Sequence, residues 1–231
     1  GQMTKLLERY GEAVGMEIAP EAIEFARKRG VRNLIQGSIT DPPFAAGSFD
    51  LVLSLDVIEH VDNDVQIIDS LFEIVKPGGH LIVTVPAFKS LWSQHDEINQ
   101  HKRRYRVGEI EGMLTQAGFR ITQATYCNSL LFPAVFAMRK GKTLLRKLRG
   151  NDEQDSPESD LAHYPKPINE LLYRIVTTET RLLKRFAPPF GVSILAVAQR
   201  PPESGIGDNP ANVSIDALVA NAERPRVLAT Q

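Results

Sequence analysis

The run Phe49-Asp-Leu-Val-Leu-Ser-Leu-Asp-Val-Ile-Glu-His60 decides the fold class of this chain. Its first part, Phe49 to Leu55, is almost continuously apolar, which indicates a strand buried on both faces of a parallel sheet. Asp56, Glu59 and His60 follow the carboxyl end of that strand. Ligands of an open parallel sheet bind at the carboxyl ends of its strands. These three titratable groups are therefore the first candidates for function.

Strand-like apolar runs alternate with amphipathic helical stretches through the first half of the chain, as in a parallel sheet wound with helices. Pro20 suits the first turn of a helix, and the turn Lys76-Pro77-Gly78-Gly79 ends another. Strands are expected at 13–18, 33–36, 49–55, 80–85, 119–126 and 192–198, and helices at 3–10, 20–29, 63–75, 107–117 and 168–186.

The alternation breaks after Tyr126, and this break predicts the domain organisation. We expect a core over 1–127, a helical insertion or cap over 128–187, the last core strand over 188–200 and a disordered tail over 201–231. The tail is rich in Pro, Gly, Asn and Ala and shows little periodicity. An acidic polar linker at 151–160 lies inside the insertion.

Composition excludes several classes of protein. The net charge is -1, so a basic protein that coats nucleic acid is not expected, and no nucleic-acid partner is predicted. The single cysteine, Cys127, fits a reducing compartment, and we expect a cytoplasmic protein.

An apolar patch followed by basic residues within 130–149 suits peripheral contact with the inner face of a membrane. A helical cap whose basic residues face solvent would have the same sequence.

Further candidates for function follow the two strands expected at 13–18 and 33–36, which lie before and after the helix expected at 20–29. Glu17 ends a predicted strand, where a carboxylate can accept hydrogen bonds from both hydroxyls of a ribose. Ser38 and Ile39 follow the next strand and would flank an adenine, although a plain turn looks the same. An acidic residue at this place is shared by nicotinamide and methyl-donor enzymes, so Glu17 alone does not separate them.

Three stretches together resemble the class I S-adenosylmethionine-dependent methyltransferases of the small-molecule type. They are VGMEIAPEAIEFA at 14–26, FDLVLSLDVIEHV at 49–61 and LFEIVKPGGHLIVTV at 71–85. The resemblance covers about 1–126 and the strand 192–198. It implies a three-layer, Rossmann-like α/β fold with a mostly parallel sheet that ends in an antiparallel pair.

The resemblance also implies the cofactor, S-adenosylmethionine, and its contacts. Glu17 would hold the ribose, and Ile18, Ser38 and Ile39 the adenine. Gly1 matches the last glycine of the family's cofactor loop, so the first, central strand is expected to be missing and the chain to be a fragment. The full set of implied cofactor contacts is Gly1, Glu17, Ile18, Ser38, Ile39 and Leu55.

Two mechanisms fit the residues after the central strand. Glu59 or His60 would act as a general base toward an acceptor hydroxyl. Alternatively, Asp56, Glu59, His60 and His101 would bind a divalent cation such as Mg²⁺. That spacing resembles the metal site of RNA 2′-O-methyltransferases and of ubiquinone-pathway O-methyltransferases. The stretch 91–105, which includes His95 and His101, is similar to a bacterial methyltransferase subgroup and suggests a lid or acceptor-binding loop.

The expected reaction is methyl transfer to oxygen of a small, lipid-linked or glycan-type acceptor. Two rivals remain open. A nicotinamide-dependent oxidoreductase also places an acid after its second strand, but the residues after Leu55 and the turn at 76–79 argue against it. The other rival is a non-catalytic scaffold that keeps the methyltransferase fold.

Overall fold

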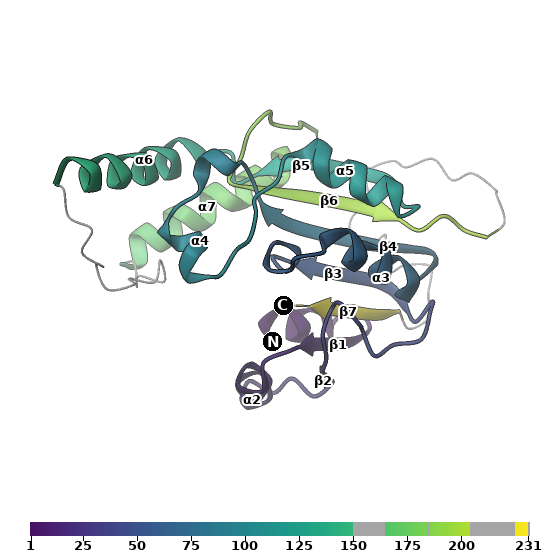
Figure 1. Ribbon diagram of the computed structural model, residues 1–231. Coiled ribbons are helices and arrows are strands. Elements are labelled where there is room, and N and C mark those ends of the chain that lie inside the picture. The colour runs from purple at the N-terminus through teal and green to yellow at the C-terminus, as the bar shows by residue number, and fades with distance from the viewer. Residues whose placement is uncertain (150–164, 184, 204–224, 231) are drawn as a thin grey trace.

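The fold is seen in a computed structural model that describes residues 1–149, 165–183, 185–203 and 225–230, with the backbone alone over 142–149 (Figure 1). Its centre is a seven-stranded sheet of order β2-β1-β7-β3-β4-β6-β5. The strands are parallel except β6, which is antiparallel to both β4 and β5. The predicted fold class is confirmed. The strands are β1 Glu12–Glu17, β2 Leu34–Gln36, β3 Phe49–Leu55, β4 Val75–Pro86, β5 Arg120–Cys127, β6 Ser193–Gln199 and β7 Arg226–Thr230.

The helices at 20–28 and 64–74 begin where local sequence signals predict, whereas those at 94–98 and 132–149 are not among the predicted helices. Pro20 opens α2, and Asn63 caps α3 because its side chain accepts a 3.2 Å hydrogen bond from the Gln66 amide. α3 ends at Ile74, just before the Lys-Pro-Gly-Gly turn. The helices are α1 Gln2–Leu7, α2 Pro20–Lys28, α3 Asp64–Ile74, α4 Gln94–Ile98, α5 Val107–Gln116, α6 Phe132–Arg149 and α7 Lys166–Leu182, with short 3₁₀ turns η1 Ile58–His60 and η2 Lys89–Leu91.

Strand β7 is the main departure from the expected organisation. Residues 226–230 fall in the segment for which the sequence predicts a disordered tail, and they instead form a strand between β1 and β3. The tail prediction is therefore wrong for these residues, while 204–224 lie outside the described residues. β7 occupies the central place that the resemblance gives to the missing first strand. Ala229, near its end, lines the same small cavity as Gly1.

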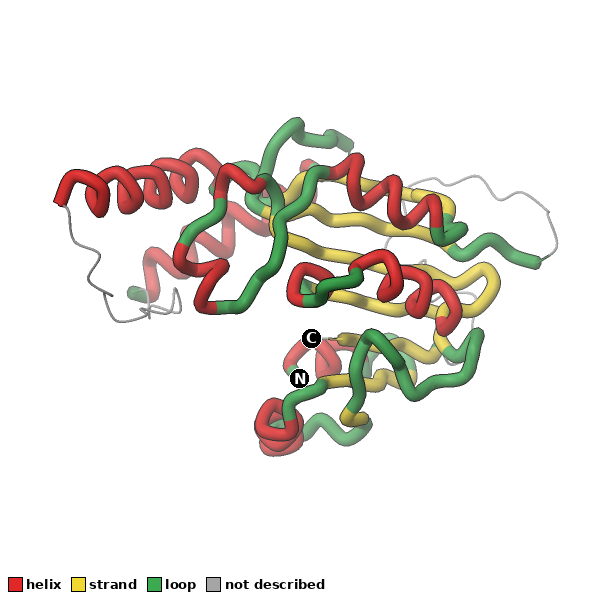
Figure 2. The backbone as a smooth tube through the Cα atoms, in the orientation of Figure 1, coloured by secondary structure: helices red, strands yellow, loops and turns green. Residues whose placement is uncertain are grey.

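Hydrogen bonds and burial hold β7 in this place. The Arg226 amide donates to Asp50 at 2.8 Å, and the Thr230 hydroxyl donates to the Leu53 carbonyl at 3.2 Å. Val227 and Leu228 are fully buried. Because the side chains of a strand alternate, Val227 joins the apolar cluster that includes Leu7 of α1, and Leu228 joins the cluster of α3 and α5 on the other face. Helices thus cover both faces of the sheet (Figure 2).

The described part of the insertion at 128–187 includes helices α6 and α7, on the side toward which the carboxyl ends of β3 and β4 point (Figure 1). Buried Glu179 of α7 anchors the start of the insertion, because its carboxylate accepts hydrogen bonds from the Ser129 amide at 2.8 Å and the Leu130 amide at 3.1 Å. Among the described residues, no helix is both long and apolar enough to cross a membrane. The predicted linker at 151–160 lies outside the described residues.

Candidate active site

The chain leaves β3 through a sharply turned segment that directs titratable groups to the carboxyl edge of the sheet. Asp56 has a positive φ of 52°, and its amide donates to the Thr84 carbonyl of β4 at 2.9 Å. A positive φ is uncommon for residues other than glycine and is found at turns and functional sites. The turn η1 follows at once and carries Glu59 and His60.

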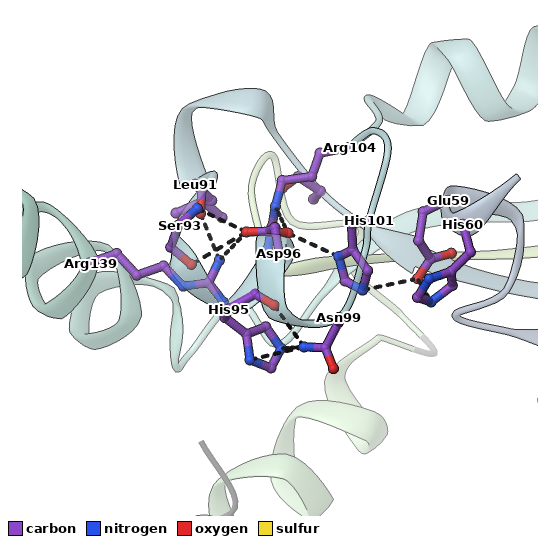
Figure 3. Close-up of polar contacts among 11 residues, drawn as sticks. Glu59, His60, Leu91, Ser93, His95, Asp96, Asn99, His101, Arg104 and Arg139 are labelled. Carbon is purple, nitrogen blue, oxygen red and sulfur yellow. Dashed lines mark hydrogen bonds and ion pairs between the residues drawn. The ribbon is translucent and has the colours of Figure 1, made fainter. Parts of the chain in front are cut away.

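Glu59, His60 and His101 form a cluster whose ligand atoms all lie within 4.8 Å of one another (Figure 3). Glu59 Oε1 is 4.0 Å from His60 Nε2 and 3.9 Å from His101 Nε2. These distances are too long for direct hydrogen bonds. The Lys102 amide donates to the Glu59 carbonyl at 2.8 Å, which fixes the backbone beside His101 against η1. The structure therefore brings these three predicted residues together, and their roles stay a prediction.

Glu59 is the most unusual member of this cluster. Its side chain is fully buried, and neither carboxylate oxygen has a hydrogen-bond partner among the described residues. Burial, with a contribution from nearby Asp56, raises the pKa of Glu59 to about 8. Burial also raises the pKa of Asp56. A buried acid without partners is costly, and in native proteins it calls for a bound ion, a water molecule or a catalytic role.

A second buried acid, Asp96, organises the loop between β4 and α5 (Figure 3). Its carboxylate accepts hydrogen bonds from Arg104 Nε at 2.7 Å and the Ser93 amide at 2.9 Å, and it pairs with His101 Nδ1 at 3.0 Å. Burial alone would raise the pKa of Asp96, but the bonds from Arg104 and His101 outweigh it and hold that pKa below its ordinary value. Through these contacts Asp96 orients His101 so that Nε2 faces Glu59.

Arg139 joins this loop from α6. It donates to the Leu91 carbonyl at 2.7 Å and lies 3.9 Å from Asp96. The sequence singled out the loop but not Asp96, Arg104 or Arg139. Ser93 and Asp96 have the spacing of a capping box, which is readable in the sequence, and the Ser93 amide donates to the Asp96 carboxylate as in such a box. No sequence signal links Arg139 to the loop, because 43 positions separate it from Asp96.

A cavity of about 470 Å³ opens beside the cluster, which is within the size range of small-molecule sites. Polar groups of β3, the loop and α6 converge on it: Asp56, His60, His95, Asn99, His101 and Arg139. A larger cavity of about 840 Å³ is lined by residues of the loop and of α5, among them Trp92, Arg103 and Met113. None of the cluster residues lines the larger cavity, so the smaller one is the better candidate for a reacting acceptor.

The predicted cofactor contacts are only partly brought together. Gly1 and Glu17 line the same cavity, of about 80 Å³. Glu17 Oε1 accepts from the Ile18 and Ala19 amides at 2.9 and 3.0 Å, and Glu17 Oε2 has no hydrogen bond among the described residues. The side chain of Ile18 is 65% exposed.

The remaining predicted contacts do not line the cavity at Gly1 and Glu17. The Ser38 hydroxyl pairs with Thr40 Oγ1 at 2.7 Å, and Ile39 is packed into the core. Leu55 is half-buried against the cluster of apolar residues that contains Leu7. Of the four predicted cation ligands, Asp56 is not in the compact cluster, although it lines the same cavity as His60 and His101.

Comparison with known proteins agrees with this architecture. Residues 1–83 match the model of a family described as a methyltransferase domain. The chain is 35% identical to erythromycin 3''-O-methyltransferase of Saccharopolyspora erythraea over 77 residues, which cover 30% of this chain and 25% of that protein. It is 31% identical to the ubiquinone biosynthesis O-methyltransferase of Xanthomonas oryzae pv. oryzae over 91 residues, 36% of this chain and 38% of that protein. The chain spans between 25% and 58% of the length of three curated relatives.

A solved structure shares the fold. It is a complex between the Haloferax volcanii Trm112 methyltransferase activator and a methyltransferase, and the likeness has a TM-score of 0.51 at 16% identity, covering 83% of this chain and 73% of that one. The match over residues 1–83 and the methyltransferase relatives support a class I S-adenosylmethionine-dependent methyltransferase, and the solved structure shares the fold.

Proposed function

We propose that this chain transfers a methyl group from S-adenosylmethionine to an oxygen atom of a small acceptor. The observation that carries the proposal is the cluster of Glu59, His60 and His101 beside a cavity of about 470 Å³ at the carboxyl edge of the sheet. Methyl transfer needs mainly in-line placement of donor and acceptor. A cavity that opens at this edge, lined by groups able to take or hold a proton, suits that task.

The residues at the end of β1 fit the ribose end of the cofactor. Glu17 Oε1 is held by two backbone amides, and Oε2 has no hydrogen bond among the described residues, so this oxygen is available for a ribose hydroxyl. The cavity at Gly1 and Glu17, about 80 Å³, is smaller than the whole cofactor, so we expect the cofactor to lie across this edge with the adenine near Ile18 and Ser38. When bound, S-adenosylmethionine supplies an electrophilic methyl group on a positively charged sulfur.

Transfer to oxygen is supported by the chemistry of the cavity and by the relatives. An acceptor hydroxyl must lose its proton, and His60 and His101 offer imidazole nitrogens at the cavity wall. Two relatives are named as O-methyltransferases, one of erythromycin and one of ubiquinone biosynthesis. These names favour a hydroxylated acceptor, and within that class we propose a lipid-linked or glycan-type one. The described part of 130–149 includes exposed Leu130 and Phe136, and we propose that it contacts a membrane surface.

The cluster also fits a divalent cation. Both oxygens of buried Glu59 lack partners, and a cation between Glu59, His60 and His101 would provide one. Two imidazoles and one carboxylate are the donor set preferred by zinc and other transition metals, whereas Mg²⁺ prefers oxygen ligands. A cation of this type would lower the pKa of an acceptor hydroxyl. Without a cation, Glu59 is protonated at neutral pH because of its raised pKa, and His60 is then the better base.

The decisive test is a screen of hydroxylated acceptors, scored by formation of S-adenosylhomocysteine, with the intact chain and with Glu59→Gln. Each assay is run after treatment with a chelator and again after adding Zn²⁺, Mn²⁺ or Mg²⁺. Methylation that is lost with the chelator and restored by a transition metal supports a bound cation. Methylation that the chelator leaves unchanged supports a histidine as general base. Cofactor binding without turnover on any acceptor favours the scaffold alternative, and binding of a nicotinamide cofactor instead contradicts the proposal.

A further inference from the structure

Exposed apolar side chains are concentrated on the two helices of the insertion. Among the described residues, 17 large apolar side chains are exposed, and 10 of them lie between positions 130 and 190. Large exposed apolar patches on a protein mark interaction sites. The densest part is one side of α7, where Ile168, Leu171, Leu172, Ile175, Val176 and Leu182 recur at helical spacing. We call this set the α7 stripe.

The α7 stripe is only partly covered by the rest of the protein. Leu172 and Ile175 are half-buried, and Glu179 on the same face is buried. Leu171 is 57% exposed and Leu182 is 52% exposed. Spacing of i, i+3, i+4 and i+7 places all six side chains on one face of the helix, where Ile168, Val176 and these two leucines are the exposed members.

The charges around the stripe are mainly positive. The exposed charged residues of α7 and the segment just after it are Lys166, Glu170, Arg174, Arg181 and Arg185, which gives four positive charges against one negative. The other acid of α7, Glu179, is buried and accepts hydrogen bonds from the start of the insertion. Lys140 on α6 adds a further exposed positive charge.

We infer that the α7 stripe lies on an anionic lipid membrane. A helix with an apolar face, a basic polar face and too little apolar length to cross a bilayer is the type that lies in the interface of a membrane. Anionic headgroups attract each Lys or Arg near the surface. A second copy of this chain is the other occupant to consider, but it would bring two positively charged helices together.

The position of the stripe would connect membrane contact with the cavity at the cluster. α6 and α7 lie on the same side as the carboxyl ends of β3 and β4, and Arg139 of α6 lines that cavity (Figure 1). Membrane attachment through α7 would therefore bring the cavity close to the lipid surface. This inference does not depend on methyl transfer, and its test is separate from any measurement of cofactor or acceptor.

The test is co-sedimentation of the full chain with phosphatidylcholine vesicles that contain or lack anionic phosphatidylglycerol. We expect binding only to the anionic vesicles, with a roughly tenfold loss when salt screens the charges. The double variant Leu171→Asp/Val176→Asp should weaken binding about tenfold or more, because it places charges in the apolar strip. The matched control is Phe25→Asp, since Phe25 is 62% exposed on α2, away from the stripe.

A second variant, Arg174→Glu/Arg181→Glu, keeps the inference testable if the apolar variant fails to fold. It should abolish the preference for anionic vesicles. The inference is overturned if the intact chain does not co-sediment with anionic vesicles, or if both double variants bind them as the intact chain does. It is also overturned if size-exclusion chromatography shows a dimer that the Leu171→Asp/Val176→Asp change dissociates. None of these outcomes alters the binding of S-adenosylmethionine, which tests the proposed function independently.

Discussion

Replacing Leu228 by alanine tests whether residues 226–230 really complete the sheet. Leu228 is fully buried and packs in the cluster shared with α3 and α5, between strands β1 and β3. Removing a buried leucine side chain costs about 2 to 5 kcal/mol, through lost burial and the cavity left behind. The centre of a sheet leaves little room for collapse, so we expect the free energy of unfolding to fall by about 3 kcal/mol.

The assay is equilibrium unfolding in urea, followed by circular dichroism. Leu171→Ala serves as the matched control, because Leu171 is 57% exposed and its truncation should change the free energy of unfolding by less than about 0.5 kcal/mol. If Leu228→Ala is no more destabilising than Leu171→Ala, then β7 does not occupy the centre of the sheet and the segment is a tail, as the sequence alone predicts.

Two further predictions concern the buried acids. Burial raises the pKa of Glu59 from 4.5 to about 8, so the folded chain holds a proton that the unfolded chain loses above pH 4.5. The contribution of this group to the free energy of unfolding is therefore full below pH 4.5 and falls by up to about 1.4 kcal/mol per pH unit until about pH 8. Glu59→Gln should remove that slope in urea titrations across this range, and an unchanged slope would show that Glu59 is not the group responsible. Asp96→Asn should destabilise the fold by about 3 kcal/mol, because buried Arg104 loses its charged partner. A conservative Asp96→Glu change that restores stability but not activity would separate the positioning of His101 from simple charge pairing.

The sequence predicts the parallel part of the fold well because each strand and helix there is defined by local signals. Phe49 to Leu55 is apolar enough to indicate a buried strand, and the structure has β3 over the same residues. The antiparallel pair β5 and β6, expected from the family resemblance, is confirmed. Strand β4 begins at Val75, earlier than expected, because backbone pairing with β3 continues irregularly through the Lys-Pro-Gly-Gly turn.

The sequence does not predict strand β7, and the reason is physical. Its five residues are a short apolar run, which by itself does not distinguish a strand from a loop. Its place in the sheet depends on partners far away, such as Asp50, which accepts from the Arg226 amide across 176 positions of sequence. Pairing over such distances leaves no periodic signal in a single sequence.

The residues of the candidate site are likewise only partly predictable from the sequence. Glu59 and His60 are predicted because they follow a buried strand directly. His101 lies near them because the loops that follow β3 and β4 both start at the carboxyl edge of the sheet. Asp96 and Arg139 are found only in three dimensions, because their roles depend on the path of a loop and of an inserted helix. Ile39, expected beside adenine, is instead buried in the core, where an aliphatic residue gains most.

The central claim is that this chain binds S-adenosylmethionine through the carboxyl edge of its sheet, and calorimetric titration tests it most directly. The account predicts one-to-one binding of S-adenosylmethionine or S-adenosylhomocysteine to the intact chain. Glu17→Ala should weaken binding by about tenfold or more, since hydrogen bonds to a charged group contribute about 1.5 to 3 kcal/mol, and Phe25→Ala should bind as the intact chain does. A folded chain that binds neither ligand, or that binds equally well without the Glu17 carboxylate, would contradict the account.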